Sequence, residues 1–246
     1  MTKRVALVTG GVGELGRAIC ERLASQGCRV VAMDISIENG AGEWLARMRA
    51  HGHDLTLVEG DVTSFDACAA TVGEVERLVG PVDILVNCAG ITRDARLANM
   101  EPDMWNEVLT TNLDSVFNIT RQVVDGMTQR GFGRIINISS LNGEKGQFGQ
   151  TNYSAAKAGM HGFTMALAQE VARKGVTVNT VSPGYMETRM VRAVPEHIRE
   201  QILEQIPLGR FGRTSEIGAV VGFLASEDAS YVTGANFSVN GGHHMH

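Results

Sequence analysis

The stretch Val5-Ala6-Leu7-Val8-Thr9-Gly10-Gly11-Val12-Gly13-Glu14-Leu15-Gly16 carries most of the information about the fold. Residues 4–9 are almost continuously apolar, which predicts a short strand buried in the middle of a parallel sheet. A glycine-rich turn follows, and apolar residues then recur at helical spacing until Gln26-Gly27. A strand, a glycine turn and a helix in this order are the context of a dinucleotide-binding site.

The glycine turn predicts a site for a pyrophosphate. Glycines let the backbone turn sharply and approach the anion closely, and the helix that follows offers unpaired N–H groups with a partial positive charge. The predicted contacts are Gly10, Gly13, Leu15 and Gly16. Taken alone, the segment is also compatible with a tight turn that binds nothing.

An acidic residue ends the second predicted strand, residues 29–33. Asp34 stands eighteen positions after Gly16, where a carboxylate accepts hydrogen bonds from the ribose hydroxyls of NAD and repels the 2′-phosphate of NADP. Neither position 35 nor position 36 is Arg or Lys. We therefore expect NADH as the cofactor, with NADPH possible but less favoured. The alternative is that Asp34 is a solvated residue at a strand end.

Predicted strands and helices alternate along the rest of the chain. The further strands are residues 54–59, 82–87, 134–139, 177–181 and 236–239, and the helices are residues 66–79, 103–130 with a break near Asn112, and 152–174. Such alternation predicts one α/β domain over residues 1–246, a Rossmann-type, doubly wound parallel sheet of about seven strands with helices on both faces. Ligands of such sheets bind at the carboxyl ends of the strands, where Gly10, Asn87 and Ser140 fall.

Residues 185–213 interrupt this alternation. They have weak strand character, several charges, and helix patterns between Pro195 and Pro207. We expect this segment to form a lid that closes over the substrate.

Tyr153 and Lys157 are four residues apart in a predicted helix, and Ser140 precedes the tyrosine by thirteen residues. Positions i and i+4 lie on one face of a helix, so the phenol and the ammonium would point to the same place. A nearby positive charge lowers the pKa of a phenol, which would make Tyr153 a general acid or base near neutrality. The pair alone is weak evidence, because such pairs also occur by chance on helix surfaces.

Together these segments resemble the short-chain dehydrogenase/reductase family over essentially the whole chain. Thr9, Gly10 and Gly16 match the family's Thr-Gly-x-x-x-Gly-x-Gly motif. Glu14 replaces the middle glycine, where a carboxylate would repel a pyrophosphate unless it points away. The resemblance implies a catalytic tetrad of Asn112, Ser140, Tyr153 and Lys157. It also implies cofactor contacts from Asp61, Val62, Asn87, Ala89, Gly90, Tyr153, Lys157, Pro183, Gly184 and Thr188.

The same resemblance implies a role for each member of the tetrad. Ser140 and Tyr153 would hold the carbonyl oxygen of a β-keto substrate, and Tyr153 would protonate it. Lys157 would lower the pKa of Tyr153 and hold the nicotinamide ribose. Asn112 would anchor a water that resupplies the proton, and Thr188 would touch the carboxamide of the nicotinamide.

A second set of segments, including residues 142–154 and 161–171, resembles the acetoacetyl-CoA reductases of polyhydroxybutyrate synthesis. This implies an acyl-CoA thioester substrate, reduction of acetoacetyl-CoA to (R)-3-hydroxybutyryl-CoA, and a homotetramer. The implied substrate residues are Asp94, Gln147, Phe148, Gln150 and Tyr185. Ordinary core packing is the alternative for Phe148. Asn99 stands where that group often has a basic residue able to contact the phosphates of CoA.

Two other functions stay open. A 3-oxoacyl-[acyl-carrier-protein] reductase would need a basic patch for its acidic carrier, and the scattered candidates are Arg130, Arg134, Arg173 and Lys174. A non-catalytic NAD-binding regulator is the alternative from a different class.

Composition limits the partners. A net charge of −5 argues against nucleic-acid binding. The four cysteines show no Cys-x-x-Cys spacing, which argues against a zinc site or a disulfide framework and suits a reducing compartment. We expect a cytoplasmic protein without membrane contact, because the sequence contains no signal peptide and no run of about 18 apolar residues. We interpret the tail His243-His244-Met245-His246 as a flexible or interface segment, with no metal site.

Overall fold

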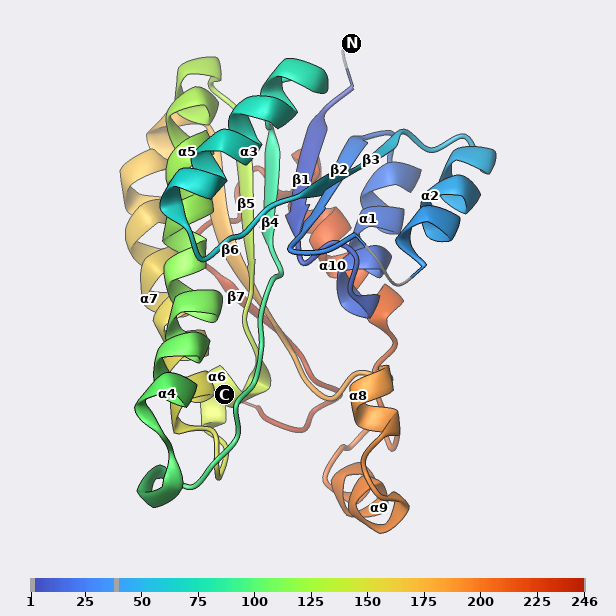
Figure 1. The fold of residues 1–246 in the computed structure, drawn as a ribbon, viewed down its shortest axis with the longest axis vertical. Coiled ribbons are helices and arrows are strands. Elements are labelled where there is room, and N and C mark those ends of the chain that lie inside the picture. The colour runs from blue at the N-terminus through green and yellow to red at the C-terminus, as the bar shows by residue number, and fades with distance from the viewer. Residues whose placement is uncertain (1–2, 38–39, 246) are drawn as a thin grey trace.

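The computed structural model describes residues 3–37 and 40–245. One sheet lies at its centre, with the strand order β3-β2-β1-β4-β5-β6-β7 and parallel pairing throughout (Figure 1). The strands are β1 (Val5–Thr9), β2 (Arg29–Asp34), β3 (Leu55–Glu59), β4 (Ile84–Asn87), β5 (Gly133–Ile138), β6 (Val176–Pro183) and β7 (Asn236–Val239). The predicted fold class is confirmed.

Helices cover both faces of the sheet (Figure 1). They are α1 (Glu14–Ser25), α2 (Ala41–Ala50), α3 (Phe65–Leu78), α4 (Pro102–Leu109), α5 (Ser115–Arg130), α6 (Leu141–Lys145), α7 (Thr151–Val171), α8 (Arg189–Arg192), α9 (Glu196–Glu204) and α10 (Thr214–Leu224), with 3-10 turns at Leu97–Asn99, Ala172–Lys174 and Glu227–Ala229. On one face, α1, α2 and α10 pack through side chains such as Leu23 and Ile217. On the other, α3, α5 and α7 pack through side chains such as Ile119 and Ala168.

The central strand β1 explains why its sequence is apolar without alternation. Ala6 and Val8 pack into the core beneath α1, whereas Val5 and Leu7 pack into the core on the opposite face. Each fully buried aliphatic side chain of the size of Val or Leu contributes about 1.5–3 kcal/mol to folding. A strand with both faces buried therefore has no place for a polar residue, as the sequence pattern predicted.

The strand order reverses at β1, because β2 and β3 extend the sheet to one side and β4 to β7 extend it to the other. In doubly wound sheets the ligand crevice opens at such a switch point, outside the carboxyl ends of the strands. Here the Gly10 loop follows β1, and Cys88-Ala89-Gly90 follows β4. Both segments therefore lie at the crevice.

Sequence reasoning found every strand but not every helix. The predicted break near Asn112 is a π-helical segment, Thr110–Asp114, between α4 and α5. The helices α2, α6, α8 and α10 were not predicted. In α10 the apolar residues are not confined to one face: Ile217 and Val221 are buried toward α1 and the sheet, whereas Phe223 is exposed, so the helical pattern is weak. Within the described residues, no helix combines the length and apolar character that crossing a membrane requires.

Candidate active site

The loop between β1 and α1 forms a cradle of backbone groups. Gly10 has a φ of +64°, a left-handed conformation that favours glycine. A Cβ atom on Gly16 would lie 2.1 Å from the Gly10 carbonyl oxygen, so this position accepts glycine alone. Gly13 is the N-cap of α1 and offers no side chain to the N–H groups of the first turn. The helix N-terminus is therefore open to an anion.

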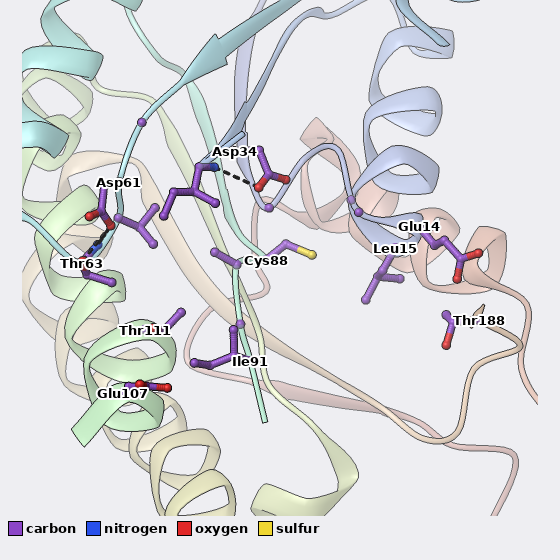
Figure 2. A pocket seen from close by; sticks show the side chains of 18 of the residues that line it. Glu14, Leu15, Asp34, Asp61, Thr63, Cys88, Ile91, Glu107, Thr111 and Thr188 are labelled. Carbon is purple, nitrogen blue, oxygen red and sulfur yellow. Dashed lines mark hydrogen bonds between the residues drawn. The ribbon is translucent and has the colours of Figure 1, made fainter. Parts of the chain in front are cut away.

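A cavity of about 820 Å³ lies over this loop, within the size range of ligand sites. Ten of the predicted cofactor contacts line it, namely Gly10, Gly13, Leu15, Gly16, Asp34, Asp61, Val62, Ala89, Gly90 and Thr188. Figure 2 shows that these residues come from separate segments and face a common space. The glycine cradle and the open helix end fit a nicotinamide dinucleotide, so the site can hold the predicted cofactor.

Five predicted cofactor contacts lie outside this cavity lining, namely Asn87, Tyr153, Lys157, Pro183 and Gly184. Asn87 is buried at the end of β4, where its Nδ2 donates to Asn137 Oδ1 at 2.8 Å and to Thr120 Oγ1 at 3.2 Å. Its side chain therefore ties β4 to β5 and α5. Pro183 and Gly184 line a second cavity, described below.

Asp34 joins the end of β2 to the glycine loop. Its Oδ2 accepts a hydrogen bond from Val12 N at 3.1 Å, and its Oδ1 accepts one from Ile35 N at 2.9 Å. The carboxylate lies on the wall of the cavity, which Asp61 also lines (Figure 2). A negative charge thus stands beside the glycine loop in a fixed position.

Glu14 turns away from the glycine loop. Its Oε2 accepts a hydrogen bond from Arg189 N at 2.6 Å, and its Oε1 pairs with an Arg192 Nη at 2.7 Å. Figure 2 shows its side chain on the same side of the cavity as Thr188 and opposite Asp61. The carboxylate that sequence reasoning expected to repel a pyrophosphate is therefore engaged by α8.

Asn112 is fully buried in the π-helical segment between α4 and α5. Its Oδ1 accepts from Ile91 N and its Nδ2 donates to Ile91 O, both at 2.8 Å. This two-point contact fixes the chain that leaves β4, directly after Gly90. The observed side chain thus holds backbone in place, and the water-anchoring role stays a prediction.

Ser140, Tyr153 and Lys157 converge at the carboxyl end of β5. Ser140 caps α6, with its Oγ accepting from Asn142 N at 3.1 Å, and its hydroxyl also bonds the phenol of Tyr153. Lys157 Nζ lies 5.6 Å from the centre of the Tyr153 ring and donates to Ile138 O at 2.9 Å. The helix spacing of four residues therefore brings the phenol and the ammonium together as expected.

The protonation of this cluster differs from the prediction. Burial raises the pKa of Tyr153, and the hydrogen bond from Ser140 offsets this only in part. Burial also lowers the pKa of Lys157, to about 8. The net shift of the Tyr153 pKa is therefore upward and not downward as predicted, because removal from water disfavours the charged form of both groups. Tyr153 is a phenol, not a phenolate, at neutral pH.

A second cavity, of about 520 Å³, lies beside the first and shares Leu15, Cys88, Gly90, Ile91 and Thr188 with it. The cavity is lined by the whole predicted substrate set and by the catalytic cluster, namely Asp94, Gln147, Phe148, Gln150, Tyr185, Ser140, Tyr153 and Lys157. Because the two cavities are adjacent, a cofactor in the first and a substrate in the second would meet near the hydroxyls of Ser140 and Tyr153.

Several of the predicted substrate residues are held by neighbouring side chains. Gln150 Nε2 donates to Asp94 Oδ2 at 2.8 Å, and Gln150 Oε1 accepts from Asn142 Nδ2 at 2.9 Å. Phe148 is 78% exposed at the rim of the cavity, so the alternative of core packing is excluded. Tyr185 stacks on the His243 ring at a centroid distance of 5.7 Å.

Sequence reasoning missed part of the cavity wall. Val191 and Val194, and then Ile198 and Ile202, line the second cavity from α8, α9 and the turn between them. Their spacing of three to four residues is an amphipathic signal that was present in the sequence. His243 was also missed, since nothing in its sequence context places it against Tyr185.

The histidine tail carries no evidence for a metal. Among the residues that the structure describes, no three His, Cys, Asp or Glu side chains lie close enough together to hold a metal ion. The last residue of the tail, His246, lies outside the described residues.

Comparisons with known proteins agree with this geometry. The family profile described as enoyl-(acyl carrier protein) reductase matches residues 11–244. The chain is 58% identical to the acetoacetyl-CoA reductase of Allochromatium vinosum over 244 residues, 99% of each chain. It is 54% identical to the acetoacetyl-CoA reductase of Cupriavidus necator over 245 residues, 100% of each chain. It is 47% identical to the 3-oxoacyl-[acyl-carrier-protein] reductase of Pseudomonas aeruginosa over 242 residues, 98% of each chain. The chain therefore belongs to the short-chain dehydrogenase/reductase family, and it is an oxidoreductase that depends on a nicotinamide cofactor.

Proposed function

We propose that this enzyme reduces acetoacetyl-CoA to (R)-3-hydroxybutyryl-CoA, with NADH as the preferred cofactor. The observation that carries the proposal is the convergence of Ser140, Tyr153 and Lys157 on a cavity that adjoins the cofactor cavity. Two relatives that match the whole chain at 58% and 54% identity are acetoacetyl-CoA reductases.

The reaction divides between the cofactor and the protein. When bound, the nicotinamide supplies the hydride. The hydroxyls of Ser140 and Tyr153 donate hydrogen bonds to the keto oxygen and stabilise the negative charge that develops there. Tyr153 then gives its phenolic proton to that oxygen, which its raised pKa permits because the phenol is protonated beforehand. The ammonium of Lys157 stabilises the phenolate that is left.

The residues proposed to hold the cofactor surround the first cavity. The first turn of α1 and the glycine loop would bind the pyrophosphate, and Asp34 the ribose hydroxyls. Asp61 and Val62 would contact the adenine. Thr188, with Pro183 and Gly184 nearby, would contact the nicotinamide.

Activity should fall at alkaline pH. Lys157 is cationic below its pKa of about 8 and neutral above it. The positive charge that stabilises the Tyr153 phenolate is therefore lost as the pH rises through that value, so kcat/KM for the ketone should decrease. Initial rates of NADH oxidation across pH test this. Lys174→Gln, on an exposed turn just before the start of β6 and so at the opposite end of the strands from the site, should leave the profile unchanged. A profile that stays flat to about pH 10 would contradict the role of Lys157.

Asp34 should set the cofactor preference. We expect the wild-type enzyme to have a higher kcat/KM for NADH than for NADPH, because the Asp34 carboxylate would repel a 2′-phosphate. Asp34→Asn should lower the NADH/NADPH ratio by about tenfold, the size of a lost charge-assisted hydrogen bond. Asp54→Asn is the matched control, since Asp54 pairs with Arg29 at the opposite ends of the strands. A wild-type preference for NADPH would refute the assignment.

The alternative substrate is a 3-oxoacyl group on acyl carrier protein, as the name of the relative from Pseudomonas aeruginosa states. A carrier needs a free basic patch, but two candidate arginines are engaged internally. Arg134 is buried and donates to Gly133 O, and Arg130 donates to Val82 O at 2.5 Å. These contacts favour the CoA thioester.

One panel of substrates tests the proposal. Purified enzyme is assayed with NADH and NADPH against acetoacetyl-CoA, longer 3-oxoacyl-CoAs and the carrier-protein thioesters. We expect the highest kcat/KM with NADH and acetoacetyl-CoA. Faster turnover of the carrier thioester would favour the alternative, and binding of NADH without turnover of any ketone would favour a non-catalytic regulator.

The remaining predictions concern organisation. We propose a single catalytic domain with a lid at 185–213, and a homotetramer. Exposed apolar side chains on α4, α5 and α7 support assembly, namely Trp105, Phe117 and Met165. The molar mass in solution tests this. The cytoplasmic location and a place in polyhydroxybutyrate synthesis stay predictions.

A further inference from the structure

Glu14 links two parts of the chain that are 175 residues apart in sequence. It is the first residue of α1, directly after the glycine loop, and it binds both ends of α8. The contacts are Arg189 N to Oε2 at 2.6 Å and Arg192 Nη to Oε1 at 2.7 Å. A carboxylate that accepts one backbone and one guanidinium hydrogen bond has a fixed orientation, and its negative charge is paired with the guanidinium.

The segment that Glu14 holds is clamped at its base. Tyr185 O accepts from Gly212 N at 2.9 Å, and Glu187 N donates to Gly212 O at 2.7 Å. The two ends of the 185–213 segment are thus tied together. A further tie lies near the far end, where Leu208 N donates to Gly241 O at 3.1 Å. Arg192, which contacts Glu14, also donates to Glu187 O at 3.1 Å, so Glu14 connects α1 directly to the clamped base of the segment.

The held helix forms a wall of both cavities. Thr188 and Arg189, at its start, line the cofactor cavity. Val191 and Val194, further along, line the substrate cavity. Glu14 itself lines the cofactor cavity, next to the loop proposed to bind the pyrophosphate. A single contact therefore connects the cofactor loop with the wall that encloses the substrate.

We propose that Glu14 is a positioning residue that latches α8 in the closed position through Arg192 and the Arg189 amide. It touches neither the keto group nor the hydride, and it acts through the lid. The inference rests on the proposed function, in which the second cavity takes the acyl thioester. It also explains why a carboxylate occupies a loop position where glycine is usual, because this carboxylate binds α8.

The latch should affect KM more than kcat. Without it, a smaller fraction of the enzyme is closed, and the apparent affinity for the thioester falls by that fraction. Both side chains are partly exposed, at 48% for Arg192 and 37% for Glu14, so solvent screening limits the effect. We expect KM for acetoacetyl-CoA to rise by about 3- to 10-fold. At saturating substrate the lid is closed, so kcat should stay within about twofold of the wild type.

A double-mutant cycle of Glu14→Gln and Arg192→Gln tests the pairing. A latch predicts that both single variants raise KM in the same direction, and that the double variant is no worse than the more severe single one. A direct electrostatic effect on the cofactor predicts that the two single variants change KM in opposite directions. Glu14→Gln removes a negative charge, whereas Arg192→Gln leaves the negative charge of Glu14 without its guanidinium partner. Opposite directions, additive effects, or unchanged KM values would overturn the proposal. Arg47→Gln, which breaks another partly exposed ion pair, with Glu21, is the matched control and should leave KM unchanged.

A second measurement separates the latch from the assignment of substrate. Limited proteolysis of 185–213, with and without NADH, reports lid closure without any ketone. We expect faster cleavage in Glu14→Gln and Arg192→Gln than in the wild type or Arg47→Gln. If acetoacetyl-CoA is not reduced but this difference is found, the substrate assignment fails and the latch stands. Equal cleavage in all four proteins would refute the latch even if the substrate is correct.

Discussion

Tyr153→Phe is expected to lower kcat for acetoacetyl-CoA by about 10²- to 10⁴-fold, the contribution typical of a general acid. The substitution removes a single hydroxyl and keeps the ring, so packing in this buried site is retained. What is lost is the proton donor and one of the two hydrogen bonds to the keto oxygen, the other coming from Ser140. The measurement is NADH oxidation at saturating substrate.

Tyr231→Phe is the matched control, because it makes the same chemical change on a fully exposed side chain. It should leave kcat and KM unchanged. Binding of NADH should persist in both variants, which would show that the loss in Tyr153→Phe is chemical and not structural. Turnover of Tyr153→Phe near the wild-type rate would contradict the proposed mechanism.

Gly16→Ala is expected to weaken cofactor binding and to destabilise the fold. The new Cβ would lie 2.1 Å from Gly10 O and 2.8 Å from Gly11 Cα, and both contacts are backbone atoms. The glycine loop must therefore move, and overpacking of this kind typically costs about 1–3 kcal/mol. Because the loop forms the cradle for the pyrophosphate, we expect the Kd for NADH to rise by at least about tenfold, a loss of about 1.4 kcal/mol. Fluorescence titration measures the Kd, and thermal unfolding measures the stability.

Gly73→Ala gives the contrast. Gly73 lies on the exposed side of α3, and a Cβ there would meet nothing within 4 Å. Alanine in a helix interior is favoured over glycine, so this variant should be more stable by about 0.4–1 kcal/mol and bind NADH normally. If Gly16→Ala behaves like Gly73→Ala, the loop is not the cradle described here.

The local pattern of residues was sufficient for the fold. An unbroken apolar run marks a strand buried on both faces, and the glycines before α1 mark a turn that no side chain permits. The spacing of four residues between Tyr153 and Lys157 was enough to place them together, because helix geometry is the same in every protein. These features depend on neighbours in sequence, so they can be read without the structure.

The chemistry of the same residues could not be read in this way. Sequence alone suggested that Lys157 lowers the pKa of Tyr153, but burial raises it, and burial depends on everything packed around the pair. Likewise, nothing in the sequence indicated that the Asn87 side chain joins β4 to β5 and α5 inside the core.

Glu14 makes the same point at the glycine loop. In the sequence it is an acidic residue in a position that suits glycine, and its effect on an anion looks unfavourable. In the folded chain, the backbone N–H of Arg189 at the start of α8, 175 residues later in the sequence, donates a hydrogen bond to this carboxylate. Backbone conformation follows from short-range patterns, whereas the energy of a charge is set by its burial and by the distant groups that folding brings beside it.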